Sequence, residues 1–249
     1  EFMIAGTLLM LGRSGYELHT MNICDGSHGT ALEDHDAIIA RRTGEAREAA
    51  KTLGAVFHEP IVDDIDLFYE RDVLARVGAV VREVKPTIML VASPQDYMED
   101  HMNACRVAVS AAFCRGMRNF VTEPVRPPIE GEVTLYHALP WGLRDSMRRI
   151  VKPGQFVDIT PALPIKRAAL ACHRSQKEWL DSSQGLDSYL TTMEEMAAEV
   201  GRMSGRYAYA EGWRRHLHLG FCSSDADPLS DALGENTFVS AEYENDLLR

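Results

Sequence analysis

Residues 87–92, Thr-Ile-Met-Leu-Val-Ala, form a nearly unbroken apolar run between Pro86 and Pro94. A strand with such a run has both faces covered, which is typical of parallel sheets flanked by helices. Ahead of this run, apolar residues at helical spacing predict helices at 36–53 and 72–84. We therefore expect residues 87–92 to form a central strand of a mainly parallel sheet.

Strands and helices alternate along the rest of the chain. We expect further helices at 4–11, 102–117, 161–180 and 185–203, and strands at 17–24, 55–58 and 133–139. This alternation predicts a Rossmann-like, doubly wound α/β fold with flanking helices, as a single domain over residues 1–249. Ligands of such folds bind at the carboxyl ends of the strands, an edge that the polar loops 25–30 and 93–101 would share.

Composition excludes several classes of partner. The 249 residues include 26 Lys and Arg against 37 Asp and Glu, a net charge of −11, which argues against nucleic acid and anionic membranes as partners. No apolar run reaches the roughly 18–20 residues that span a bilayer. The five cysteines include no Cys-x-x-Cys pair, so we expect free thiols in a reducing cytoplasm.

The segment from Ser93 to His101 holds three carboxylates and one imidazole directly after the predicted central strand. His101 could ligate a metal while a neighbouring carboxylate fixes its tautomer. Alternatively, the segment is an ordinary helix start, where acids are favoured by the helix dipole. The residue pattern alone favours the second interpretation. In the loop before the third helix, Asp63, Asp64 and Asp66 are expected to be solvated turn residues.

Five short motifs, taken in order, resemble those of the LmbE-like (PIG-L) zinc-dependent N-deacetylases. They are Cys24-Asp25-Gly26 (a TDG-like turn), Arg42-Thr43-Gly44-Glu45 (Arg-x-Gly-Glu), Asp100-His101 (the end of HPDH), His173-Arg174-Ser175-Gln176 (His-x-Ser-Gln) and Tyr209-Ala210-Glu211. Each motif is weak by itself, but the resemblance covers nearly the whole chain.

The resemblance implies a metal-dependent hydrolase that removes an N-acetyl or related acyl group from an amino sugar or small glycoconjugate. It implies His101 as a metal ligand, Asp100 as a catalytic residue, and Asp25 and Arg42 as substrate-binding residues. The metal would be Zn²⁺, or another divalent ion. Homo-oligomerisation stays open.

The family's first metal motif, HPDDxE, is not found in the 249 residues. In the family it leads into a segment like Glu-Phe-x-x-x-Gly-Thr-Leu, which matches residues 1–8, so Glu1 falls on the motif's last acid, a catalytic position. We expect an upstream strand that ends in a His/Asp-rich turn, giving zinc two His and one carboxylate and lowering the pKa of bound water toward ~7. The alternative is that Glu1-Phe2 is a cloning scar before a start residue, Met3.

Met98 stands where the family usually has a histidine that acts as an acid or stabilises an oxyanion, and methionine can do neither. His137, His216 or His218 could take over this role, although ordinary surface histidines are the simpler interpretation of the last two. Met98 therefore favours an alternative function, a non-catalytic ligand-binding protein on the same fold. A nucleotide-binding protein is disfavoured, because no GxGxxG or GxxxxGK[ST] motif occurs.

Arg42 lies on an apolar helical stripe between Ile39 and Ala46. A guanidinium placed on such a stripe needs a partner, because an unpaired buried charge is costly. The residues leave two partners equally open. One is a substrate hydroxyl or carboxylate, as the resemblance implies, and the other is a carboxylate at the sheet edge.

Overall fold

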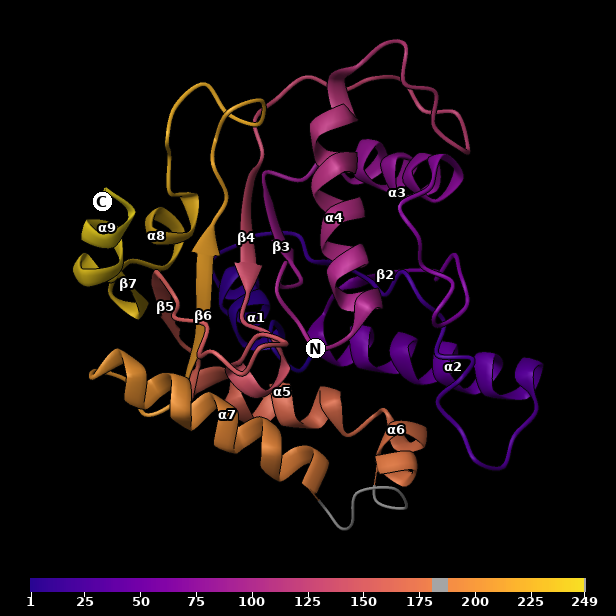
Figure 1. Cartoon of the computed structure of the whole chain (residues 1–249), viewed down its shortest axis with the longest axis horizontal. Coiled ribbons are helices and arrows are strands. Elements are labelled where there is room, and N and C mark those ends of the chain that lie inside the picture. The colour runs from indigo at the N-terminus through magenta and orange to yellow at the C-terminus, as the bar shows by residue number, and fades with distance from the viewer. Residues whose placement is uncertain (181–187, 249) are drawn as a thin grey trace.

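A computed structural model describes residues 1–180 and 188–248 (Figure 1). Its α-helices are α1 (Ala5–Arg13), α2 (His35–Leu53), α3 (Arg71–Val84), α4 (Glu99–Phe113), α5 (Leu163–Leu170), α6 (Arg174–Leu180), α7 (Ser188–Ser204), α8 (Pro228–Leu233) and α9 (Ala241–Leu247). Its strands are β1 (His19–Met21), β2 (Val56–His58), β3 (Ile88–Val91), β4 (Thr134–Ala138), β5 (Gln155–Asp158), β6 (Ala210–Arg215) and β7 (Thr237–Val239). Among these described helices, none combines the length and the apolar character needed to cross a bilayer.

The strands form two sheets. β1 and β2 pair in parallel, with His19 opposite Val56 and Met21 opposite His58. The other sheet has the order β3-β4-β6-β5-β7. In it β3 and β4 are parallel, whereas β4–β6, β6–β5 and β5–β7 are antiparallel. The protein is therefore a mixed α/β fold.

Two details differ from the expected Rossmann-like sheet. The five-stranded sheet is mixed, so a mainly parallel sheet is not confirmed, and β3 lies at its edge rather than at its centre. The antiparallel half is built from β5, β6 and β7, strands that the apolar pattern did not predict. The apolar run at 87–92 correctly predicted a strand but not its position in the sheet. An apolar run indicates that both faces of a strand are covered, but it does not indicate whether both of its edges pair with other strands.

Capping residues explain the bounds of the two helices that the sequence predicted most accurately. Asp34 begins α2 by accepting a hydrogen bond from the backbone N–H of Ala37 (2.9 Å). Gly54 ends it in the left-handed conformation, with φ of 70°. Helix α3 ends at Val84, and its capping residue Lys85 stands directly before Pro86, which cannot continue a helix.

Helices cover the two faces of the larger sheet. On one face, Leu9 of α1 packs in a cluster with Tyr136, Val157 and Trp213. On the other face, Ala112 of α4 packs with Val91, Val133, Leu135 and Phe221. Figure 1 shows α4 and α3 next to each other beside β3, and α5 and α7 at the lower end of the sheet. Apolar residues of β4 thus point alternately to two different cores, as a strand covered on both sides requires.

A buried ion pair joins helix α5 to strand β6, and its carboxylate also holds the start of α1. The Nζ atom of Lys166 lies 2.6 Å from Oε1 of Glu211, and both side chains are almost fully buried. Glu211 also accepts hydrogen bonds from the backbone N–H groups of Gly6 (2.8 Å) and Thr7 (2.7 Å). These amides belong to the first turn of α1, where backbone N–H groups have no hydrogen-bond partner inside the helix. The Glu211 of the Tyr-Ala-Glu motif is therefore a structural residue.

Candidate active site

The segments that follow β1, β2 and β3 meet at one edge of the molecule. One potential ligand atom each from Cys24, Asp64 and Asp100 lies within 4.8 Å of the others. Cys24 follows β1, Asp64 follows β2, and Asp100 lies in the first turn of α4, after β3. The prediction that the loops 25–30 and 93–101 share one edge is therefore confirmed.

Asp64 holds the glycine-containing loop after β1. Its Oδ1 accepts a hydrogen bond from the N–H of Gly26 (3.0 Å), and its Oδ2 accepts one from the N–H of His28 (3.4 Å). The N–H of Asp64 in turn donates to Oγ of Ser27 (3.0 Å). Asp64 is thus a structural acceptor for this loop, where the sequence predicted a solvated turn residue.

Arg42 lies directly against the same loop. Its Nη1 donates to the carbonyl oxygen of Gly26 (3.3 Å), and the side chain is only half-buried. A Cβ atom at Gly26 would lie 2.3 Å from Nε of Arg42, and one at Gly29 would lie 2.3 Å from its Nη1. Among the described residues Arg42 forms no ion pair with a carboxylate. The backbone carbonyl group of Gly26 is its partner instead of the carboxylate that was one of the two expected partners. A substrate contact stays a prediction.

Replacing Gly26 by Ala should destabilise the loop by about 1–3 kcal/mol, because φ is 84° at this position and the new methyl group would overlap Arg42. The matched control is Gly54→Ala, where φ is 70° but no atom lies within 4 Å of the added Cβ. Urea unfolding of both variants separates the cost of the backbone conformation from the cost of displacing Arg42. Equal losses in the two variants would contradict tight packing of Arg42 on the loop.

His101 is oriented by a buried carboxylate. Its Nδ1 lies 3.0 Å from Oδ1 of Asp96, and Asp96 is almost fully buried while the imidazole is 43% exposed. Oδ1 of Asp96 also accepts the N–H of Met98 (3.2 Å), and Oδ2 accepts the N–H of Trp141 (3.3 Å). A carboxylate held in this way fixes the imidazole with Nδ1 protonated and leaves Nε2 as the free nitrogen. The expected neighbouring carboxylate is therefore Asp96.

Asp100 faces the other side of the site. It is buried, and its Oδ2 accepts a hydrogen bond from the N–H of Ile65 (2.7 Å). Ile65 has a φ of 71°, a conformation that a β-branched residue rarely adopts. Such strain persists only where neighbouring contacts impose it, and it is often found at functional sites. Asp100 therefore links α4 to the loop that carries Asp64.

The described residues do not by themselves provide the ligands of a catalytic zinc ion, which usually takes three protein ligands. Burial, together with the nearby carboxylates of Asp100 and Asp64, raises the pKa of Cys24 to about 12, so its thiol is protonated at neutral pH. Both oxygens of Asp64 already accept backbone hydrogen bonds. His101 lies outside this cluster and offers a single imidazole nitrogen.

Glu1 and His173 line the same cavity as Asp96 and His101, a space of about 780 Å³. Oε1 of Glu1 lies 3.2 Å from Nε2 of His173, and both side chains are nearly buried. Burial raises the pKa of Glu1, whereas the hydrogen bond with His173 and the charges of His173 and Arg42 lower it. The sequence did not predict His173 as a site residue, although its place in the His-x-Ser-Gln motif was a signal.

The same motif is also structural. Glu45, the acid of the Arg-x-Gly-Glu motif, accepts hydrogen bonds from the N–H (3.0 Å) and the Oγ (2.6 Å) of Ser175. Ser175 lies in the first turn of α6, where backbone amides lack partners inside the helix. Glu45 of the Arg-x-Gly-Glu motif thus caps helix α6, which carries Ser175 of the His-x-Ser-Gln motif. This contact brings together two motifs that are far apart in the sequence.

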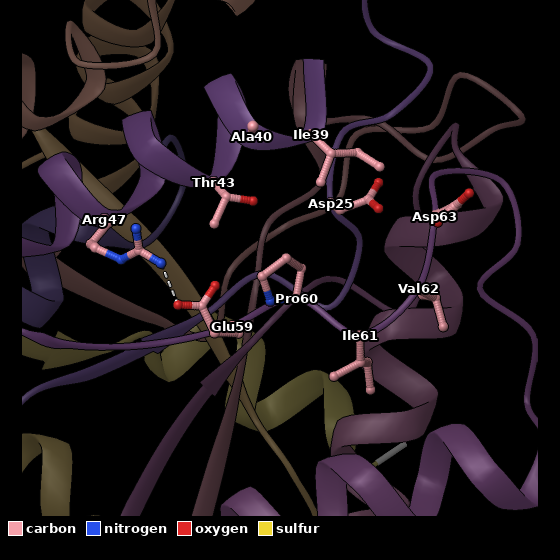
Figure 2. Close-up of a pocket in the computed structure, with 10 residues that line it drawn as sticks. All are labelled: Asp25, Ile39, Ala40, Thr43, Arg47, Glu59, Pro60, Ile61, Val62 and Asp63. Atoms are coloured by element: carbon pink, nitrogen blue, oxygen red, sulfur yellow. Dashed lines mark hydrogen bonds and ion pairs between the residues drawn. The ribbon is translucent and has the colours of Figure 1, made fainter. Parts of the chain in front are cut away.

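Asp25 lies beside a second, shallower pocket of about 560 Å³ (Figure 2). Figure 2 shows Asp25 and Asp63 at one end of this pocket and the ion pair between Arg47 and Glu59 at the other. Oδ1 of Asp25 accepts the N–H of Ser27 (2.9 Å), a turn-forming contact. Substrate binding by Asp25 stays a prediction.

His137, His216 and His218 do not line the 780 Å³ cavity, so their suggested substitution for the histidine replaced by Met98 is not supported. Instead, Nε2 of His137 and Nδ1 of His216 lie 2.8 Å apart. Nδ1 of His137 lies 3.4 Å from the carbonyl oxygen of Ala92, which can only accept, so His137 accepts from His216. His216 is half-buried rather than an ordinary surface histidine.

The protein should lose stability between pH 6.5 and pH 4 through His137. Burial, followed by the charge of His216, lowers the pKa of His137 to about 4. The unfolded chain binds a proton near pH 6.5, so this stability is complete above that pH and is lost as the pH falls, by up to about 3 kcal/mol. Urea unfolding of the wild type and of His137→Gln at pH 7 and pH 5 measures this slope. An unchanged slope in the variant would contradict the assignment.

Comparisons with known proteins find similar sequences. The family model for PIG-L, described as GlcNAc-PI de-N-acetylase, matches residues 1–113. Diacetylchitobiose deacetylase of Thermococcus kodakarensis is 29% identical over 222 residues, covering 85% of this chain and 76% of the relative. The 4-oxalmesaconate hydratase of Pseudomonas putida is 26% identical over 180 residues, covering 69% of this chain and 67% of the relative.

Solved structures show the same fold. The N,N'-diacetylchitobiose deacetylase of Pyrococcus horikoshii, solved with its inhibitor MPG, superposes with a TM-score of 0.70 at 23% identity. The match covers 92% of this chain and 83% of that structure. The resemblance drawn from five short motifs is confirmed, because the PIG-L family model matches the N-terminal 113 residues and a deacetylase is among the similar sequences.

Proposed function

We propose that this protein is an amide hydrolase that removes an N-acetyl group from an amino sugar or a small glycoconjugate. The observation that carries the proposal is the position of His101, oriented by buried Asp96, next to Asp100 at the edge where the loops after β1, β2 and β3 meet. The similarity to a diacetylchitobiose deacetylase supports the substrate class.

The proposed roles follow from burial and charge. His101 presents Nε2 to the cavity, and Asp100 and Glu1 are the carboxylates that would hold or accept a proton. Glu1 lies beside His173, whose hydrogen bond favours the ionised carboxylate, so it suits a base better than an acid. Arg42 and Asp25 would contact the polar groups of the sugar. His173 is a candidate proton donor, because it lies beside Glu1 and lines the cavity.

We further propose that the enzyme uses a divalent metal, and that this metal is zinc. The support is the family match and the single nitrogen of His101 that Asp96 leaves free. The cluster of Cys24, Asp64 and Asp100 offers a protonated thiol and, in Asp64, a carboxylate already used by backbone hydrogen bonds, so His101 carries the metal proposal. The five cysteine thiols are free, which supports the expected cytoplasmic location.

Acetate release tests the proposed activity. The protein is incubated with N-acetylglucosamine, diacetylchitobiose and N-acetylated glycolipid headgroups, with and without Zn²⁺. We expect a free amine and acetate in equal amounts from at least one substrate. Binding of these sugars without acetate release would instead support the non-catalytic alternative, which Met98 favours.

The hydratase relative defines a second assay on the same samples. Addition of water across a conjugated double bond removes near-UV absorbance, whereas amide hydrolysis leaves a free amine. Incubation with an unsaturated dicarboxylic keto acid therefore separates the two reactions. Loss of absorbance without acetate release from any acetylated sugar would overturn the deacetylase proposal.

A further inference from the structure

Arg214 of β6 is a guanidinium close to the catalytic edge that none of the proposed roles uses. Strand β6 pairs with β4, and Arg214 lies opposite His137 near the carboxyl end of β4. Strand β3 lies on the other side of β4 (Figure 1). We infer that Arg214 is a positioning residue, which holds the loop after β3 so that Asp96 presents His101 to the cavity. This inference rests on the proposed function of His101.

The side chain of Arg214 reaches across the end of β4 and binds this loop at two points. Its Nη1 donates to Oε1 of Gln95 (2.7 Å), and its Nη2 donates to Oγ of Ser93 (3.3 Å). The Oγ of Ser93 also donates to the carbonyl oxygen of Gln95 (2.8 Å) and accepts from its N–H (3.2 Å). Asp96, which orients His101, is the next residue. The guanidinium therefore fixes the segment directly before the orienting carboxylate.

The backbone of this loop contributes little to its own position. In the part of the chain that the structure describes, residues 93–97 make no hydrogen bond from backbone to backbone. Side chains set the path of the loop instead, namely the Ser93 hydroxyl group, the Asp96 carboxylate and the Arg214 guanidinium. Of these three, Arg214 is the one that extends from a strand of the sheet. It gives the loop a rigid reference point, since groups on strands are placed more precisely than groups on loops.

The charge of Arg214 gives a second argument. The side chain is partly buried, and among the described residues it forms no ion pair with a carboxylate. Its Nε atom is buried without a hydrogen-bond partner. Burial also lowers the pKa of the guanidinium, which shows that its charge is held there at a cost. A cation without a counter-charge lowers stability in such a place. Groups that lower stability in this way are typical of functional sites.

The next residue of β6 provides a matched control for a kinetic test. Consecutive residues of a strand point to opposite faces, and Arg215 pairs with Asp225 (3.0 Å). We expect Arg214→Met to lower kcat for acetate release by about 10–100-fold. KM should change little, because Arg214 does not line the 780 Å³ cavity. Arg215→Met should leave both constants nearly unchanged. Arg214→Lys keeps the charge but lacks the planar fork that binds two acceptors, so its kcat should be intermediate.

Nitrogen-15 NMR of the histidine side chains provides a measurement that does not depend on activity. The spectra are recorded without added metal, above the ordinary histidine pKa of about 6.5, and the His101 signals are assigned with His101→Ala. In the wild type, Asp96 should hold His101 with Nδ1 protonated. In Arg214→Met, the imidazole should shift toward the Nε2-protonated tautomer that free histidine prefers. A variant that is only less stable, but still folded, would keep the wild-type tautomer.

Gln95→Ala tests the same contact from the loop side, and it decides the question if Arg214→Met does not fold. Gln95 is exposed, so its truncation removes one of the two contacts without disturbing the sheet. It should change kcat and the His101 tautomer in the same direction, by a smaller amount.

An unchanged kcat and an unchanged tautomer in folded Arg214→Met, or in Gln95→Ala where Arg214→Met does not fold, would overturn the inference and leave the deacetylase proposal intact. A wild type that releases no acetate would instead overturn the deacetylase proposal. In that case the His101 tautomer alone decides whether Arg214 positions the loop.

Discussion

Glu211→Gln should lower the free energy of unfolding by about 3–5 kcal/mol, because it leaves the buried ammonium group of Lys166 without its counter-charge. The same change weakens the acceptor for the amides of Gly6 and Thr7 at the start of α1. Urea unfolding monitored by circular dichroism at pH 7 measures the loss.

The next residue along α5 offers a matched control. Arg167 forms an ion pair with Glu194 at 2.7 Å, but both side chains are substantially exposed. Glu194→Gln should therefore cost less than about 1 kcal/mol. The double variant Lys166→Met with Glu211→Gln should recover part of the loss, because it removes the unpaired charge. Similar losses of unfolding free energy in Glu211→Gln and Glu194→Gln would show that burial of the Lys166–Glu211 pair does not increase the cost of removing its negative charge.

His101→Ala should abolish acetate release and tight zinc binding while leaving the fold largely intact. The reason is that the imidazole is partly exposed and its loss removes one metal ligand. Asp96→Asn should be milder, with a loss of about 10–100-fold in metal affinity, because Asp96 orients the imidazole. Metal content by elemental analysis and acetate release by a coupled assay measure both effects.

His35→Ala is the control for His101, because His35 is an exposed histidine at the start of α2 that hydrogen-bonds Asp36 and Asp63. It should leave metal content and activity unchanged. Asp100→Asn separates the two carboxylates: its metal affinity should fall no more than about 10–100-fold, because Asp100 is proposed to act on a proton and not to bind the metal directly. If His101→Ala keeps full zinc content and activity, residues 93–101 are an ordinary helix start.

Local sequence patterns predicted the helices of the N-terminal half closely. Helices α2 and α3 begin and end within one residue of the expected bounds, because Gly54 and Pro86 stop them through local backbone preferences. The expected helix at 161–180 is two helices, α5 and α6, separated at residues 171–173. The expected helix at 185–203 begins outside the described residues and corresponds to α7 from Ser188 on.

The site was predicted in outline. Motif order pointed to His101 and Asp100, and both lie at the expected edge. The neighbouring carboxylate expected for His101 is Asp96, although the pattern did not single it out, and Arg42 packs on Gly26 rather than on a carboxylate. Spacing places residues on one loop or one helix face, but it does not say which of several nearby carboxylates meets an imidazole. That choice depends on the path of the loop between β3 and α4.

The strands β5, β6 and β7 show most clearly what the amino-acid order leaves open. β6 contains Gly212, Arg214 and Arg215, and no apolar alternation marks it as a strand. It is held instead by long-range contacts: Trp213 packs beside Leu9 and donates a hydrogen bond to Thr7, and Glu211 binds Lys166. Periodicity and capping are local properties, so they determined the helices, the buried strand β3 and the family motifs. Strand partners and direction depend on contacts between residues up to about 200 positions apart, and only the folded structure decides them.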